Sequence, residues 1–137
     1  MMYIRKITVA LLILIGINTL VSAQGLTLTS KDISGQLSIN EVFNGFGCTG
    51  KNISPELSWS NVPKGTKSFA VSVYDPDAPT GSGWWHWIVF NISKDVRSLQ
   101  AGAGDISAKL LPQGAIQNVI DYGFAGFGGA CPPEGDK

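Results

Sequence analysis

The chain has 137 residues, with ten basic and ten acidic side chains, 44% hydrophobic residues, one histidine and two cysteines. Such a length suits a single domain with a modest core. The lysines are scattered along the chain, which argues against nucleic acid as a partner, because binding to phosphate backbones needs a clustered basic surface.

The first 23 residues are predicted to be a secretory signal peptide. Arg5 and Lys6 precede a fourteen-residue apolar stretch, 7–20, and small residues end the segment at Ala23, as in a cleavable leader. A transmembrane anchor is the alternative, but the stretch is shorter than the roughly 18 to 20 residues that a bilayer requires. Cleavage after Ala23 would remove two basic and no acidic residues, leaving a secreted or periplasmic domain, 24–137, with a net charge of −2 and no membrane span.

Short strands dominate the rest of the chain. The segments 26–29 and 57–60 alternate between apolar and polar residues, which predicts half-exposed strands. The segments 69–74 and 87–92 are nearly continuous apolar runs, which predicts strands buried on both faces at the centre of a sheet. Helical signals are weak, and 93–99 is the best short candidate. The domain is therefore expected to be mainly β.

Two polar residues flank the central strands. If these strands are antiparallel neighbours, Asp75 lies just past the end of the first and His86 just before the start of the second. The ten-residue connection 76–85 is too long for a tight hairpin, and its two prolines stiffen it, so it can form a pocket wall. Aromatic residues crowd this place, at Tyr74, Trp84, Trp85 and Trp87.

Such a pocket would suit an anion. A protonated imidazole beside neutral donors is a suitable receptor for phosphate or carboxylate, and the glycine-rich segment 123–129 offers backbone N–H groups that can converge on the same ligand. The alternative interpretation is that Asp75 and His86 form a structural pair that caps the sheet.

The two cysteines, Cys48 and Cys131, leave two alternatives open. In an oxidising compartment they can form a disulfide, or both can remain buried thiols, because separation in sequence says nothing about the distance between their Cα atoms.

Other chemistries find weak support. Residues 45–52 match the spacing of a phosphate-binding loop, but Asn52 replaces the required Ser or Thr and Pro55 follows closely, which prevents a regular helix. Ser82 with His86 and Asp75 could supply a hydrolase triad, yet no Gly-x-Ser-x-Gly elbow is present. One histidine and two distant cysteines fall short of a zinc site, so no metal or other cofactor is expected.

Longer motifs show a family resemblance. The segment DPDAP at 75–79, followed by WWHWIVFNI at 84–92, resembles the two linked signatures of the phosphatidylethanolamine-binding proteins. Upstream, GCTGKNISPELSW at 47–59 resembles the bacterial branch called Raf-kinase-inhibitor-like. Downstream, GGACPPEG at 128–135 is similar to the Gly-Pro-Cys-Pro-Pro-x-Gly loop of the family, with Ala130 in place of the usual proline.

This resemblance implies a fold and a site. The fold would be an antiparallel β-sandwich with short helices, and the site a small cavity for phosphate-like or acetate-like anions. Its residues would be Asp75, Asp77, His86, Cys131, Pro132 and Pro133. Because the family continues with a His-Arg-Tyr strand that this chain does not reach before Lys137, the domain is expected to be truncated at its C-terminus.

The function implied is binding rather than catalysis. The leading hypothesis is a non-enzymatic protein that captures a small anionic ligand or a phospholipid headgroup. The alternative is an inhibitor or regulator of a protein partner, since family relatives are known as kinase or protease inhibitors.

Overall fold

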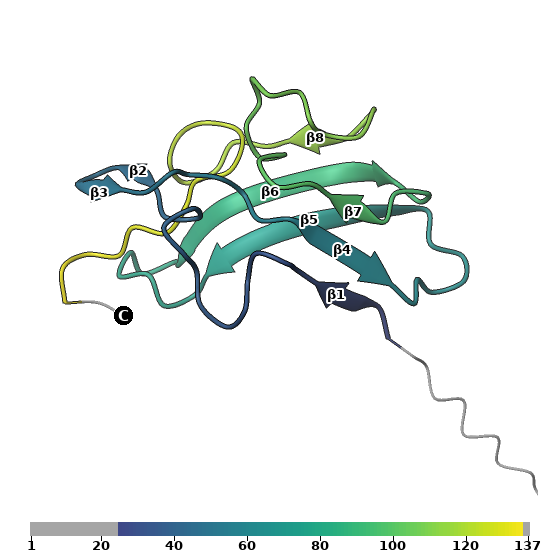
Figure 1. Ribbon diagram of the computed structural model, residues 1–137, viewed down its shortest axis with the longest axis horizontal. Helices are drawn as coiled ribbons and strands as arrows, with labels where there is room; N and C mark the ends of the chain where they lie inside the picture. The colour runs from purple at the N-terminus through teal and green to yellow at the C-terminus, as the bar shows by residue number, and fades with distance from the viewer. Residues whose placement is uncertain (1–24, 136–137) are drawn as a thin grey trace, which may run out of the picture.

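The computed structural model describes residues 25–135, so the predicted signal peptide lies outside the described residues. Within this range the chain forms eight short strands and no helix (Figure 1). In chain order they are β1 (Thr27–Thr29), β2 (Asn44–Gly45), β3 (Cys48–Thr49), β4 (Leu57–Ser60), β5 (Ser68–Asp75), β6 (Trp84–Ser93), β7 (Ser98–Leu99) and β8 (Ile116–Gln117).

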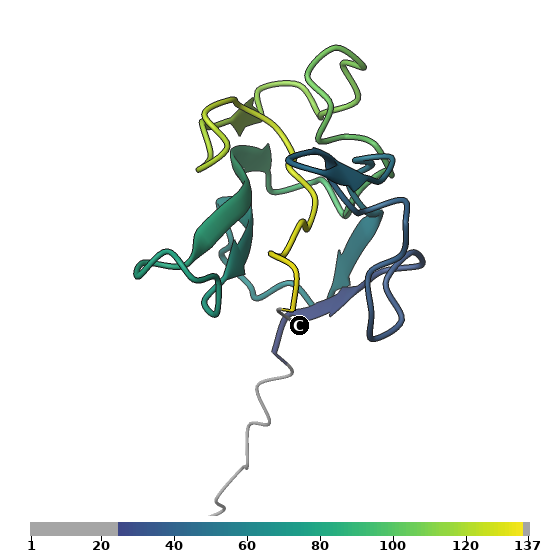
Figure 2. The ribbon, with the colours of Figure 1, turned by 90° about the vertical axis from the view of Figure 1, so that its left-hand side faces the viewer.

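The strands form two three-stranded sheets and one small hairpin. One sheet has the order β1-β4-β7, the other has the order β5-β6-β8, and β2 pairs with β3. Every pairing between these strands is antiparallel. Figure 2 shows β5 and β6 on one side of the molecule and β1 and β4 on the other. The predicted antiparallel β-sandwich is confirmed.

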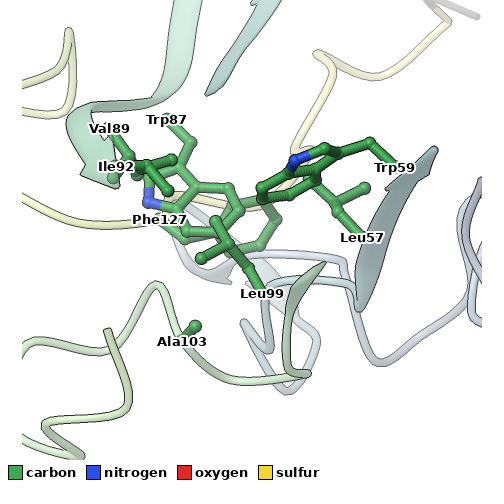
Figure 3. Close-up of a cluster of buried hydrophobic side chains, with 8 residues drawn as sticks. All are labelled: Leu57, Trp59, Trp87, Val89, Ile92, Leu99, Ala103 and Phe127. Carbon is green, nitrogen blue, oxygen red and sulfur yellow. The ribbon is translucent and has the colours of Figure 1, made fainter. Parts of the chain in front are cut away.

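Side chains from both sheets make the core (Figure 3). Trp87 and Val89 of β6 are completely buried, and Leu57 and Trp59 of β4 face them from the other sheet. The indole N–H of Trp87 donates to the side-chain oxygen of Gln117 at 2.6 Å, so this polar atom is satisfied inside the core, as burial requires. The long strand β6 is thereby anchored on its inner face.

Two expectations about the strands are wrong. Neither long strand is buried on both faces: in β5 Ala70 and Ser72 are exposed, while Val71 and Val73 turn inward. In β6 Phe90 and Asn91 are exposed. In β5 every second residue is small or polar, so the side chains alternate between an exposed and a buried face of the sheet. The segment 93–99 is not a helix but a turn at 94–95 followed by β7.

Candidate functional site

The register of β5 and β6 places Asp75 and His86 at the same end of the sheet. Asp75 is the last residue of β5 and pairs with Trp84, the first residue of β6. Both strands are longer than the sequence predicted, so the connection between them is the eight-residue loop 76–83 rather than 76–85. The expected proximity of the two polar residues follows from this register.

His86 occupies an irregular position in its strand. Val73 pairs with Trp87 and Tyr74 pairs with Trp85, so His86 has no partner on β5. An extra residue of this kind is a β-bulge, a feature that re-aims side chains next to functional sites. It lets the half-buried imidazole of His86 lie along the cavity while Trp87, the next residue, enters the core.

The imidazole is held by the glycine-rich loop 126–130. Its Nδ1 lies 2.7 Å from the carbonyl oxygen of Gly128, and because a carbonyl can only accept, Nδ1 carries the hydrogen. The amide N–H of Gly128 donates back to the carbonyl of His86 at 2.8 Å. The ring position and tautomer are thereby set, and Nε2 is left as the ring atom that can meet a ligand.

Asn52 holds the same loop from the other side. Its side-chain oxygen accepts from the N–H of Gly129 at 2.7 Å, and its side-chain nitrogen donates to the carbonyl of Phe127 at 3.1 Å. Gly129 lies so close to the backbone of Glu41 that any Cβ would clash there. The loop sequence is therefore glycine-rich for a steric reason at this position.

The loop 76–83 is also fixed by hydrogen bonds. Asp75 accepts from the N–H of Asp77 at 2.9 Å, a local turn that aspartate side chains favour. The hydroxyl of Tyr74 donates to the carbonyl of Ser82 at 2.7 Å, and the hydroxyl of Thr80 donates to the carbonyl of Gly83 at 2.6 Å. This loop therefore makes an ordered wall beside Asp75.

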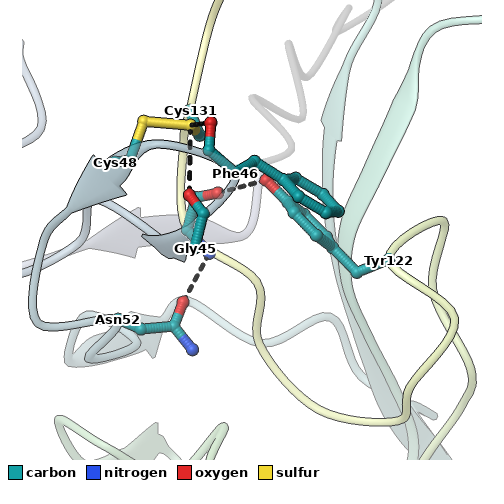
Figure 4. The surroundings of a disulfide bond; sticks show 7 residues. Gly45, Phe46, Cys48, Asn52, Tyr122 and Cys131 are labelled. Carbon is teal, nitrogen blue, oxygen red and sulfur yellow. Dashed lines mark hydrogen bonds between the residues drawn. A yellow bond between two sulfur atoms is a disulfide. The ribbon is translucent and has the colours of Figure 1, made fainter.

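Cys48 and Cys131 are joined by a disulfide, with their Cα atoms 5.9 Å apart. Figure 4 shows that the bond ties the β2–β3 hairpin to the segment after the glycine-rich loop. Beside it, the ring of Phe46 stacks on Tyr122 with centroids 5.6 Å apart. Phe46 nevertheless remains 76% exposed, so it forms an apolar rim rather than core.

These loops and strand ends enclose one cavity of about 340 Å³. All six residues that the family resemblance implied for the site line it. The other lining residues are Phe46, Ala78, Pro79, Thr80, Trp84, Tyr122 and Ala130. A second cavity, of about 230 Å³, is lined by residues of the segment 105–117 and contains none of the predicted site residues.

Sequence reasoning missed Phe46 and Tyr122 as site residues. A large aromatic residue between two glycines, as at 45–47, is a usable signal once the adjacent Cys48 is known to be bonded to Cys131. For Tyr122 the signal is its place directly before the glycine-rich segment 123–129. The Tyr122 hydroxyl donates to the carbonyl of Gly129 at 2.6 Å.

The ionisable groups around the cavity are mostly acidic. Asp75 and Asp77 contribute carboxylates, and no lysine or arginine of residues 25–135 lines the cavity. Burial raises the pKa of the Tyr122 hydroxyl above its ordinary value, and a hydrogen bond with Trp84 opposes this shift in part. His86 is the only lining group that becomes a cation on protonation, so it is the natural anchor for a negative charge.

The residues considered for a hydrolase, a phosphate-binding loop and a metal site do not come together in the described part of the chain. Ser82 does not line the cavity, and His86 bonds to the carbonyl of Gly128 rather than to Asp75, so the hydrolase triad is absent from the described residues. The segment 45–52 forms the β2–β3 hairpin instead of the strand-to-helix junction of a phosphate-binding loop. Within 25–135 no group of three or more metal-binding side chains converges, and no helix is long and apolar enough to cross a bilayer.

Comparison with known proteins gives consistent matches. A family model described as phosphatidylethanolamine-binding protein matches residues 29–137. The UPF0098 protein YbcL of Escherichia coli (strain K12) is 59% identical over 117 residues, covering 84% of this chain and 64% of that protein. The UPF0098 protein YbhB of the same strain is 50% identical over 111 residues, covering 80% of this chain and 70% of that protein.

Solved structures agree with these matches. A crystal structure of E. coli YbcL, described as a new member of the mammalian PEBP family, superimposes with a TM-score of 0.79 at 60% identity, covering 82% of this chain and 70% of that one. A putative PEBP homologue from Chlamydia trachomatis gives a TM-score of 0.58 at 34% identity, covering 80% and 67%. The present chain spans 64% of the length of YbcL, slightly under two thirds.

Proposed function

Because this chain belongs to the phosphatidylethanolamine-binding protein family, we propose that it is a secreted, non-enzymatic binding protein whose cavity captures a small anion. The ligand would be phosphate, a phosphorylated headgroup or a carboxylate. The observation that carries this proposal is the convergence of two neighbouring stretches, at 75–79 and at 86, with the distant segment 131–133 on one cavity of about 340 Å³. A volume of this order suits a small ligand.

The cavity has the parts that such binding needs. Phe46, Trp84 and Pro132 supply apolar walls, which lower the local dielectric constant and strengthen polar contacts with the ligand. His86, with Nδ1 committed to Gly128, presents Nε2 as a donor when protonated. A bound anion would therefore meet a positioned N–H and a shaped rim.

Affinity measurements on a His86 variant test this proposal. Inorganic phosphate and phosphoethanolamine are titrated into the protein while backbone amide resonances are followed, and we expect saturable shifts at Gly128, Gly129 and the loop 76–83. His86→Gln should weaken binding about tenfold or more, because a hydrogen bond to a charged group is lost.

A matched variant controls for the loss of a positive charge. Lys94 lies in an exposed ion pair with Asp95 and does not line the cavity, so Lys94→Gln should bind phosphate as the unmodified protein does. If the unmodified protein and His86→Gln bound phosphate with equal affinity, His86 would not be part of the binding site.

The proposal includes export and removal of residues 1–23. The disulfide between Cys48 and Cys131 supports it, because such bonds persist in oxidising compartments. Mass spectrometry of the protein from the extracytoplasmic fraction should give a chain that starts at Gln24. Recovery of the intact N-terminus from the cytosol alone would contradict export.

The role of inhibitor or regulator of a protein partner stays a prediction. It is separated from small-ligand binding by affinity capture from the extracytoplasmic fraction, performed with and without saturating phosphate. A regulator retains a specific protein partner under both conditions, whereas a binding protein for small anions retains none.

A further inference from the structure

The charge of the cavity is unusual for a receptor of anions. Asp75 and Asp77 both line it, and among residues 25–135 no lysine or arginine does. An anion that enters meets the half-buried carboxylate of Asp75 and the exposed carboxylate of Asp77, and like charges brought together in this way repel each other. Protonation of His86 supplies one compensating positive charge. The ligand itself must therefore reduce the repulsion from the carboxylates.

Three of the hydrogen-bond donors on the lining side chains are already committed. The hydroxyl of Tyr122 donates to Gly129, the hydroxyl of Thr80 donates to Gly83, and Nδ1 of His86 donates to Gly128, at 2.6, 2.6 and 2.7 Å. None of these hydrogens is free for a ligand unless an existing bond breaks, which costs free energy.

Acceptors, in contrast, remain available. Oδ1 of Asp75 accepts from the N–H of Asp77 at 2.9 Å, and its Oδ2 has no hydrogen-bond partner within the described residues. A carboxylate oxygen has capacity for further donors. Asp75 is therefore complementary to a ligand that brings an acidic hydrogen of its own.

We propose that Asp75 makes this cavity selective for oxyanions that carry an acidic hydrogen, such as hydrogen phosphate, over oxyanions that carry none, such as sulfate or a phosphate diester. The P–OH group donates to the carboxylate of Asp75, while protonated Nε2 of His86 donates to a charged oxygen of the same ligand. An oxyanion without hydrogen places a lone pair against the carboxylate instead. This inference rests on the proposed function and names the ligand class of the same site.

Three probes separate hydrogen-bond donation from charge. Inorganic phosphate carries at least one acidic hydrogen at neutral pH, whereas sulfate and dimethyl phosphate carry none, and these two differ from each other in charge. We expect phosphate to bind about tenfold or more tightly than both, since the lost interaction is a charge-assisted hydrogen bond. Affinities are measured by calorimetry at neutral pH and constant ionic strength.

Asp75→Asn tests the residue responsible. Asparagine still accepts the N–H of Asp77, so the local turn is kept, but it removes the charge and adds a donor. The variant should lose the preference for phosphate and bind sulfate more tightly than the unmodified protein. Asp95→Asn, at an exposed site outside the cavity, should leave all three affinities unchanged.

The outcomes distinguish the two claims. Equal affinity of the unmodified protein for all three anions, or an unchanged preference in a folded Asp75→Asn protein, overturns the selectivity inference and leaves anion binding standing. Absence of binding for every anion overturns the proposed function as well. The comparison in the unmodified protein decides the inference even if the variant fails to fold.

Discussion

Asn52 lies outside the cavity, yet its side chain determines where the cavity wall sits. Both polar atoms of its carboxamide bond to the loop that holds His86, at Phe127 and Gly129. The backbone of Asn52 has φ 53°, a left-handed conformation that asparagine tolerates better than most residues. One residue thus combines a permitted backbone geometry with two loop contacts.

We predict that Asn52→Gly lowers the free energy of unfolding by about 1 to 3 kcal/mol, because it leaves a partly buried donor and acceptor without partners. Asn52→Ala should cost about 1 kcal/mol more, since alanine is strained at positive φ. Urea unfolding of the two variants measures the contribution of the carboxamide contacts and the cost of alanine at positive φ. Stability of Asn52→Gly equal to that of the unmodified protein would mean that the carboxamide contacts contribute nothing.

At the scale of elements, the two longest strands were predictable and their irregularity was not. Apolar runs at 69–74 and 87–92 indicated β5 and β6, and their order placed Asp75 and His86 at one end. The bulge at His86 depends on which residues of β5 pair with β6, and nothing in either strand alone specifies that register. The half-exposed alternation of β5, in contrast, was visible in the sequence of that strand alone.

The residues of the cavity also divide into those that the sequence predicted and those that it did not. Its six predicted residues came from family motifs, because spacing alone favoured a structural pair of Asp75 and His86 over a pocket. Phe46 and Tyr122 were missed because they reach the cavity through long-range packing: the disulfide brings the hairpin 44–49 beside Cys131, a contact across most of the domain. Local patterns do not encode contacts of this sequence separation.

Tyr122 makes one element of the site sensitive to alkaline pH. Burial raises the pKa of its hydroxyl, so folding favours the protonated form. The stabilisation is complete below the pKa of the unfolded chain and is lost as the pH rises through that of the folded protein. We expect the urea midpoint to fall in this alkaline range, and the fall to be smaller in Tyr122→Phe. A midpoint whose alkaline dependence is identical in Tyr122→Phe would contradict this role.

At the scale of the whole molecule, the disulfide links residues 83 positions apart. Closing so long a loop restricts the unfolded chain, which stabilises the folded state by roughly 4 kcal/mol in the chain-entropy model. It also fixes Cys131, Pro132 and Pro133 beside the cavity. The stability of the domain and the shape of the cavity therefore depend on the same bond.

We predict that replacing both cysteines, Cys48→Ser with Cys131→Ser, lowers the free energy of unfolding by about 2 to 4 kcal/mol and weakens binding of phosphate. Urea unfolding and calorimetry measure the two effects. Reductant should destabilise the unmodified protein and leave the double variant unchanged. A double variant as stable as the oxidised protein would show that the bond does not constrain the fold.

The central claim is that this cavity binds a phosphate-like anion at His86. Because the chain contains one histidine, its Cε1–H resonance reports on the site without ambiguity. We predict that inorganic phosphate shifts this resonance saturably at constant pH and ionic strength, and that chloride does not. A resonance that stays unmoved by phosphate in the folded protein would contradict the account.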